Sequence, residues 1–217
     1  VLLIFNLKGA GYAIILPRIV DTILGCLIAW FAVSFIWPDW NFRNISSTIK
    51  KSNQATLDYF DAVVKQYQFG KNNSLDYRRA RRTAHNAQIE LSSMISSLST
   101  EPNPNQALIH SAFRYLVYSH SQLSYVSALG SHREQVQDAQ VLDLMLGCKD
   151  TLFAVLLQQQ ALDMDKIQAK LEEIKQMSTQ ENLSEDLLLV LKQISLLLET
   201  LPELLKLRTE LWAQEIK

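Results

Sequence analysis

Residues 17–37 read PRIVDTILGCLIAWFAVSFIW, and this stretch decides how the rest of the chain is interpreted. Its only charged residues are Arg18 and Asp21, both in the first turn of the helix that we expect. At about 1.5 Å per residue this helix is roughly 31 Å long, close to the roughly 30 Å hydrocarbon core of a bilayer. Pro17 stands where a helix start tolerates proline, and Pro38 ends the run. The stretch therefore predicts one transmembrane helix.

The residues before this span are also apolar, because the chain begins VLLIF and not with methionine. We expect them to end a preceding apolar helix, with further spans N-terminal to it. A signal peptide is the alternative, but no basic segment opens the chain and no small-residue cleavage site follows Trp37. We therefore predict that residues 1–40 end a truncated multi-pass membrane domain and that residues 41–217 form a soluble helical domain.

Small residues follow one side of the predicted span. They are Thr22, Gly25, Ala29 and Ala32, which recur at helical spacing. Small side chains let helix backbones approach each other closely in lipid. Gly25, Ala29 and Ala32 are therefore candidates for a helix-packing face, whose partners we expect among membrane helices that this sequence does not contain.

The ionisable pair Arg18 and Asp21 extends the same face. Such a pair in a span is costly unless it is paired or hydrated, which makes it a functional hypothesis. Arg18 could attract an anionic solute, and Asp21 could position its side chain or accept a proton. Together with Thr22 and Gly25 they are the candidates for a transport path. The alternative is an interfacial pair that only fixes the position of the helix.

The remainder of the chain has helical periodicity, and no run alternates as a strand does. We expect helices over residues 45–69, 75–99, 104–129, 133–160, 163–177 and 184–215. Asn103 and Ser74 are expected N-caps. Pro202 is expected to interrupt the last helix, because Thr200 and Glu203 form a capping-box pattern there. The fold class that follows is an all-α bundle.

The last segment, residues 183–212, is rich in leucine. Some leucines have heptad spacing, which would suit a partner surface, but others spread around the helix. Burial inside the bundle and partial exposure as an oligomer contact therefore both stay open.

The densest charge run is RRARR at residues 78–82, followed by His85. On a helix, one side of this run carries Arg78, Arg81, Arg82 and His85. This side could bind anionic lipid headgroups or a phosphorylated ligand. The alternative is a solvated helix face, paired with acids such as Asp76 and Glu90.

Several function classes are disfavoured. A formal net charge of −1 gives no strong field for nucleic acid. The two cysteines, Cys26 and Cys148, indicate no disulfide framework. No spacing typical of metal ligands and no nucleophile, Walker or dinucleotide motif occurs. We therefore expect no enzyme, no metal and no cofactor.

Three strings resemble a known family. Residues 18–40, RIVDTILGCLIAWFAVSFIWPDW, are similar to the last transmembrane helix of YccS/YhfK-type inner-membrane proteins, which belong to the fusaric acid resistance-like family. Residues 77–85, YRRARRTAH, and the pair Glu101-Pro102 fit as well. The resemblance reaches to about Pro102.

This resemblance implies a protein similar to aromatic-acid efflux pumps of the bacterial inner membrane, of which this chain would be the C-terminal part. It also implies that Arg18, Asp21, Thr22 and Gly25 are the family's helix-start motif. The implied location is a multi-pass inner-membrane protein with a cytoplasmic C-terminal domain, and we expect the lipid bilayer and a homo-oligomer as partners. The alternative is a membrane-tethered scaffold or oligomerisation module without transport.

Overall fold

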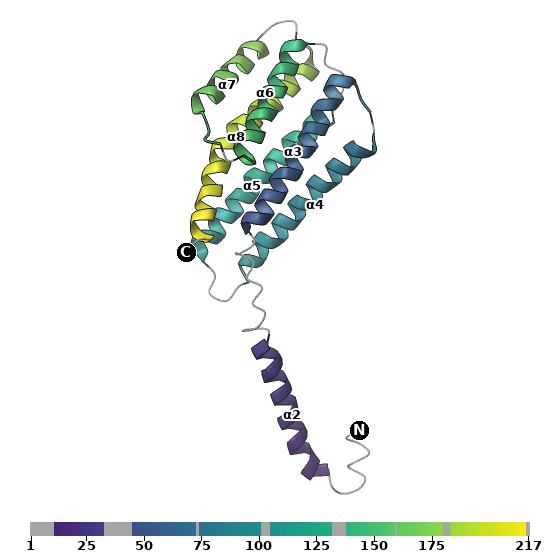
Figure 1. Cartoon of the computed structure of the whole chain (residues 1–217), viewed down its shortest axis with the longest axis vertical. Helices are drawn as coiled ribbons and strands as arrows, with labels where there is room; N and C mark the ends of the chain where they lie inside the picture. Colours follow the sequence, from purple (N-terminus) through teal and green to yellow (C-terminus); the bar gives the residue numbers. More distant parts are fainter. Residues whose placement is uncertain are drawn as a thin grey trace. The chain divides into compact units, whose positions relative to one another are not determined.

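The computed structural model describes residues 11–32, 45–72, 74–100, 105–131, 138–158, 160–179 and 183–215. Seven α-helices and no β-strand occur in these ranges (Figure 1), which confirms the predicted all-α class for them. The chain divides into two compact units, Val1–Trp40 and Asn41–Lys217.

In the first unit, the structure describes helix α2, Gly11–Phe31. Every side chain described from residue 15 to residue 31 is exposed, with Leu16 at 70% and Ile28 at 66%. Among the described helices, none combines the length and the apolar character that crossing a membrane requires. The predicted span over residues 17–37 is thus not supported, and its residues 33–37 lie outside the described ranges.

The predicted helix start at Pro17 is wrong. Helix α2 begins at Gly11, so Pro17 lies in its interior. A proline there removes one backbone hydrogen bond and crowds the carbonyl four residues earlier. Apolar residues before Pro17 continue the helical pattern, and this local cost does not end the helix.

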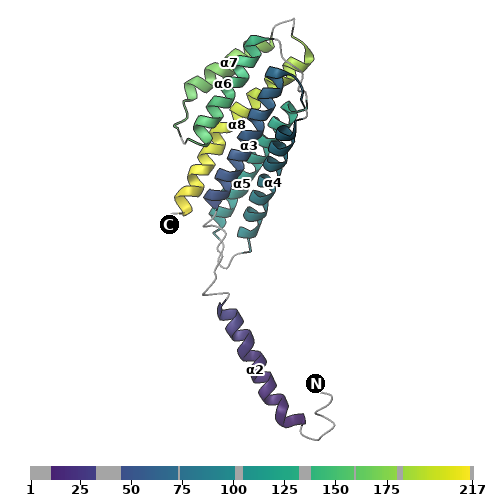
Figure 2. The same cartoon turned by 45° about the vertical axis from the view of Figure 1, so that its right-hand side comes forward.

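The described helices of the second unit run alongside one another (Figure 2). They are α3 (Ile45–Phe69), α4 (Leu75–Leu98), α5 (Gln106–Leu129), α6 (Ala139–Leu156), α7 (Met164–Ser178) and α8 (Glu185–Glu215). Helix α3 packs against α4, α5 and α6, whereas α8 packs against α5, α6 and α7. Helices α4 and α7 lie at opposite margins of the bundle in both views.

Short polar side chains cap the starts of five of these helices, including α8, where the Ser184 hydroxyl accepts a hydrogen bond from the Leu187 backbone N–H at 3.3 Å. The predicted cap Ser74 accepts a hydrogen bond from the Tyr77 backbone N–H at 3.2 Å. Helix α5 begins two residues later than expected, at Gln106, because the Asn105 side chain accepts from the next backbone N–H groups. The expected cap Asn103 lies outside the described residues. Helices α6 and α7 begin in the same way, after Asp138 and Asp163.

Helix α8 continues through Pro202, so the predicted interruption there is wrong. Side chains satisfy backbone carbonyls in the turn before the proline. Gln122 Nε2 donates to the Leu197 carbonyl at 2.8 Å, and Thr200 Oγ1 donates to the Leu196 carbonyl at 2.7 Å. Neither bond reaches the Leu198 carbonyl, which the proline leaves without its helical donor, but Thr200 acts as a donor inside one continuous helix and not as the cap of a new one.

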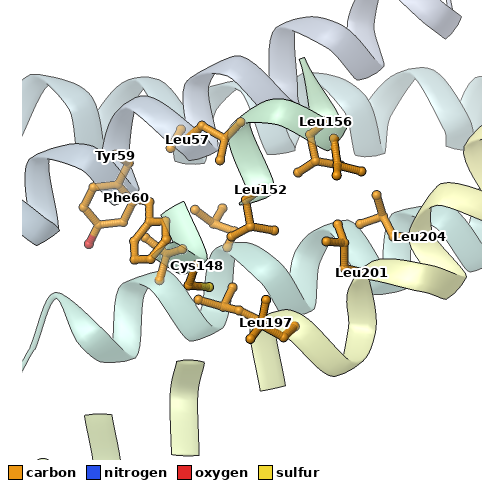
Figure 3. Packing of buried hydrophobic residues seen from close by; sticks show 14 of the residues in the cluster. Leu57, Tyr59, Phe60, Cys148, Leu152, Leu156, Leu197, Leu201 and Leu204 are labelled. Atoms are coloured by element: carbon orange, nitrogen blue, oxygen red, sulfur yellow. The ribbon is translucent and has the colours of Figure 1, made fainter. Parts of the chain in front are cut away.

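All six described helices of the second unit contribute to its hydrophobic core, and α3, α6 and α8 contribute most. Figure 3 shows Leu57 and Phe60 of α3, Cys148, Leu152 and Leu156 of α6, and Leu197, Leu201 and Leu204 of α8 packed together. Burying one such side chain contributes about 1.5–3 kcal/mol. The leucine-rich segment thus serves chiefly the core, and Leu189, at 45% exposure, is its most exposed described leucine.

Candidate functional site

The transport-path candidates lie along one side of α2. The Thr22 hydroxyl donates a hydrogen bond to the Arg18 carbonyl oxygen at 2.8 Å, so its proton is already used by the helix backbone. Arg18 and Thr22 line a shallow surface depression together with Ile15, Ile19 and Ile23. Its chemistry is one cationic group on an apolar surface, which suits an anion that also carries an apolar body.

Asp21 lies one helical turn after Arg18, and both side chains are exposed. Although both are described, no ion pair joins them, so the structure does not show Asp21 holding the Arg18 side chain. The Arg18 guanidinium therefore has its donors available on the surface of α2.

The predicted packing face of α2 is open. A Cβ added at Gly25 would meet no atom within 4 Å, and Ala29 is exposed, while Ala32 is half-buried. Space for a close helix neighbour is therefore present at Gly25, and within the described residues nothing fills it.

The charges of α4 are separated by sign. Glu90 binds Lys51 of α3, with its carboxylate 2.6 Å from the ammonium. The other acid of α4, Asp76, lies near Lys65 of α3: a hydrogen bond to Asp61 raises the pKa of the Lys65 amine, and the Asp76 charge raises it further. Glu90 thus pairs with a lysine of α3, the Lys65 ammonium binds Asp61, and neither acid of α4 forms an ion pair with the arginines that the sequence pattern offered as partners within the described residues.

The arginines of α4 lie away from these pairs. Arg78, Arg79, Arg81, Arg82 and His85 are all exposed. None of the four arginines has an ion-pair partner in the part of the chain that the structure describes. The run is therefore a concentration of uncompensated positive charge.

His120 of α5 lies next to this run. Burial lowers the pKa of His85, and the positive charges of Arg81, one turn earlier on α4, and of His120, on the adjoining helix α5, lower it further. We call the surface formed by Arg78, Arg81, Arg82, His85 and His120 the basic face. Two helices build it, and the sequence alone indicated only the α4 part.

Two tyrosines fix the position of the basic face relative to the core. The hydroxyls of Tyr59 and Tyr77 are hydrogen-bonded, 3.3 Å apart, and Tyr77 donates to the Gly130 carbonyl at 3.3 Å. Tyr59 belongs to α3, Tyr77 to the first turn of α4, and Gly130 ends α5. Desolvation by burial, and then the bond to Tyr77, raise the pKa of the Tyr59 hydroxyl above its ordinary value. The contact ties three helix segments together beside the arginines.

Sequence reasoning missed a buried arginine in α8. Arg208 is 6% exposed, and its Nη1 donates to the Val155 and Leu156 carbonyls at 3.2 and 3.0 Å. These carbonyls end α6, where the helix dipole favours a cation. The guanidinium also lies 4.9 Å from the centre of the Trp212 ring. The sequence did hold one signal of this burial: Arg208 lies between Leu207 and Leu211, on the side of α8 that carries its buried leucines. This position indicates a structural role.

The interior cavity of the bundle is too small for a solute. It holds about 10 Å³ and is lined in part by Asn53, Ser119 and Gln122. The Asn53 Nδ2 and Gln88 Nε2 donors near it have no partner. A space of this size holds about one water molecule, and a water there would satisfy a buried donor.

No cluster of three or more metal-ligating side chains occurs within the described ranges. The sequence-based expectations of no metal and no catalysis stay predictions.

The chain is 41% identical to the inner membrane protein YccS of Escherichia coli over 97% of its own length and 30% of that protein. The predicted resemblance is confirmed. This chain is a relative of YccS. An uncharacterised protein of Haemophilus influenzae is 38% identical over 64% of the chain, and YhfK of E. coli is 36% identical over 27% of it. These matches cover 20% and 8% of the two proteins.

The chain thus spans less than a third of the length of the curated relatives it matches. No protein-family model matches it, and no solved structure is significantly similar. Similarity to YccS supports an association with the bacterial inner membrane. Because the match covers 97% of the chain, the similarity to YccS includes the second unit.

Proposed function

We propose that this chain is part of an inner-membrane transporter that exports aromatic carboxylic acids, with the second unit as its cytoplasmic helical domain. The observation that carries the proposal is the 41% identity to an inner membrane protein across nearly the whole chain. In this proposal, α2 belongs to a multi-pass membrane domain completed by helices outside this sequence.

The surface of α2 supports this role. Its exposed apolar side chains need a non-aqueous environment, since soluble proteins rarely expose so large a contiguous apolar surface. The open space at Gly25 admits a neighbouring helix at close approach. Arg18 is then the group that binds the carboxylate of the solute, because guanidinium and carboxylate fit each other in a bidentate manner.

The test is uptake of a labelled aromatic carboxylate into inverted membrane vesicles that carry the full-length protein. Export by the cell corresponds to accumulation in these vesicles. We expect accumulation with the parent protein and its loss with Arg18→Gln, while the amount of inserted protein stays the same. Lys175→Gln, which removes one exposed charge of α7, is the matched control and should transport normally. Unchanged accumulation with Arg18→Gln would remove Arg18 from the path.

A tethered scaffold that forms a homo-oligomer is the second candidate. Helix α2 favours it, because its exposed surface can pack against a second copy as well as against other helices of the same protein. The leucines of α8 do not favour it, since most of them are buried in the bundle. Light scattering of the detergent-solubilised full-length protein tests this candidate. A dimer or larger assembly without any transport supports the scaffold, and a monomer contradicts it.

A further inference from the structure

The outer side of α4 and α5 has an unusual charge composition. Helix α5 contains no aspartate or glutamate between Gln106 and Leu129, and its one arginine, Arg114, binds Glu203 of α8 at 2.6 Å. Of the two acids of α4, Glu90 binds Lys51 of α3, and Asp76 forms no ion pair with any arginine of its helix. The basic face is therefore positive, and among the described residues no ion pair neutralises its arginines.

Exposed apolar side chains continue the basic face along both helices. On α4, Ile89 is 66% exposed and follows His85 by four residues, which places it on the same side of the helix. On α5, Val117 is 63% exposed and precedes His120 by three residues, and Phe113 is exposed one turn earlier. Arginines near the start of α4 thus lie on the same side of that helix as exposed Ile89, and the adjoining helix α5 adds exposed Val117 and Phe113.

We infer that this surface docks onto the headgroups of an anionic lipid bilayer. Arginine guanidinium groups bind lipid phosphates in a bidentate manner, and exposed apolar side chains beside them enter the interfacial region. An acidic protein segment would match the charge, but the bilayer is favoured for two reasons. The similarity to an inner membrane protein supports a position of this unit near a membrane, and arginines spread over successive turns of one exposed helix side suit a diffuse charged plane.

The position of the basic face defines how the bundle would meet the bilayer. Arg78 lies in the first turns of α4, next to the end of α3, whereas Ile45 begins α3 at the other end of the unit (Figure 2). With 25 residues at about 1.5 Å each, α3 is roughly 37 Å long. Docking therefore requires the bundle to lie lengthwise, with α4 and α5 toward the lipid. The inference rests on membrane proximity and does not depend on transport.

The first test uses residues 41–217, because every residue of the described core cluster lies between Ile45 and Leu211. After circular dichroism shows that the fragment is folded, its co-sedimentation with phosphatidylglycerol and with phosphatidylcholine vesicles is measured. We expect binding to the anionic vesicles only, and release as salt is raised. Each basic residue contributes about five-fold to the partition coefficient, so the double variant Arg78→Gln, Arg82→Gln should bind roughly 25-fold more weakly.

The matched control, Lys175→Gln with Lys192→Gln, removes the same charge from exposed sites on α7 and α8 and should bind nearly as the parent does. Equal weakening by both double variants, or equal binding to both lipids, would overturn the inference. So would competition by inorganic phosphate at constant ionic strength, which indicates a site for a small anion. Binding of polyglutamate by a folded fragment that ignores vesicles would indicate an acidic protein partner and would overturn it too.

A second measurement keeps the inference testable if the fragment does not fold. The whole chain is placed in nanodiscs of either lipid, and its arginines are modified with phenylglyoxal and quantified by mass spectrometry. Arg78 and Arg82 should be protected in phosphatidylglycerol and modified in phosphatidylcholine, while Arg114 reacts equally in both. Equal modification of Arg78 and Arg82 in the two lipids contradicts docking. A negative transport assay leaves this result unaffected, so the two proposals fail separately.

Discussion

Replacing the buried arginine Arg208 by methionine should destabilise the bundle measurably. The change keeps an unbranched apolar side chain in the same space and removes the two hydrogen bonds to the Val155 and Leu156 carbonyls. A hydrogen bond with a charged partner contributes about 1.5–3 kcal/mol. Its loss also leaves two carbonyls at the end of α6 without this donor.

Desolvation of the buried guanidinium acts in the opposite direction, because its removal stabilises the variant. The guanidinium is desolvated, which lowers the pKa of Arg208, and its Nε has no hydrogen-bond partner. No carboxylate among the described residues forms an ion pair with it. Both bonds come from one nitrogen, so they do not add fully. We therefore expect Arg208→Met to lower the free energy of unfolding by about 2 kcal/mol.

The assay is urea denaturation of residues 41–217, followed by circular dichroism. Lys206→Met is the matched control, because Lys206 lies two residues away with an exposed side chain and should change the free energy by less than about 0.5 kcal/mol. Hydrogen exchange should also show faster exchange at the end of α6 in the Arg208 variant alone. A variant as stable as the parent would refute the reasoning, because desolvation of the cation would then outweigh its bonds.

Three further predictions concern other residues of the bundle: Gly130, Cys148 and His85. Gly130→Ala places a Cβ 2.7 Å from the Tyr59 hydroxyl oxygen and should lower the free energy of unfolding by about 1–3 kcal/mol in a urea titration; an unchanged midpoint would contradict the close approach. Burial raises the pKa of Cys148 to about 12, so its thiol should not react with a thiol reagent at pH 8 until urea unfolds the fragment. Burial and then Arg81 lower the pKa of His85 below 6.5, so the unfolded state binds the proton more tightly and stability should decrease as the pH falls below about 6.5. Arg81→Gln should raise the His85 pKa in an NMR titration, and an unchanged value would show that the two groups are not neighbours.

Much of the fold could be predicted from helix punctuation and periodicity. Ser74 and Asp163 sit at helix starts as local rules require, because their side chains accept hydrogen bonds from the first free backbone N–H groups. Pro202 misled the prediction, because helix α8 continues through it where Leu198, Leu201 and Leu204 are buried against other helices. Local rules do not contain those contacts.

In the candidate sites, too, the features that depend on one helix could be predicted, whereas those that depend on packing between helices could not. Exposure of the arginine run followed from its density on one helix, because so many cations are not buried together. The partner of Glu90 did not follow from the sequence, since Lys51 of α3 reaches it only once the two helices are packed. That His85 and His120 belong to one basic face likewise depends on the packing of α4 against α5.

We propose that residues 1–40 hold the helical bundle at a membrane. The most direct test expresses residues 1–217 and residues 41–217 in bacteria, isolates the membranes and washes them with alkaline carbonate, which strips peripheral proteins. We expect the longer chain to stay in the membrane pellet and the shorter chain to be released, by alkaline carbonate and also by high salt. Release of both chains alike would contradict the claim.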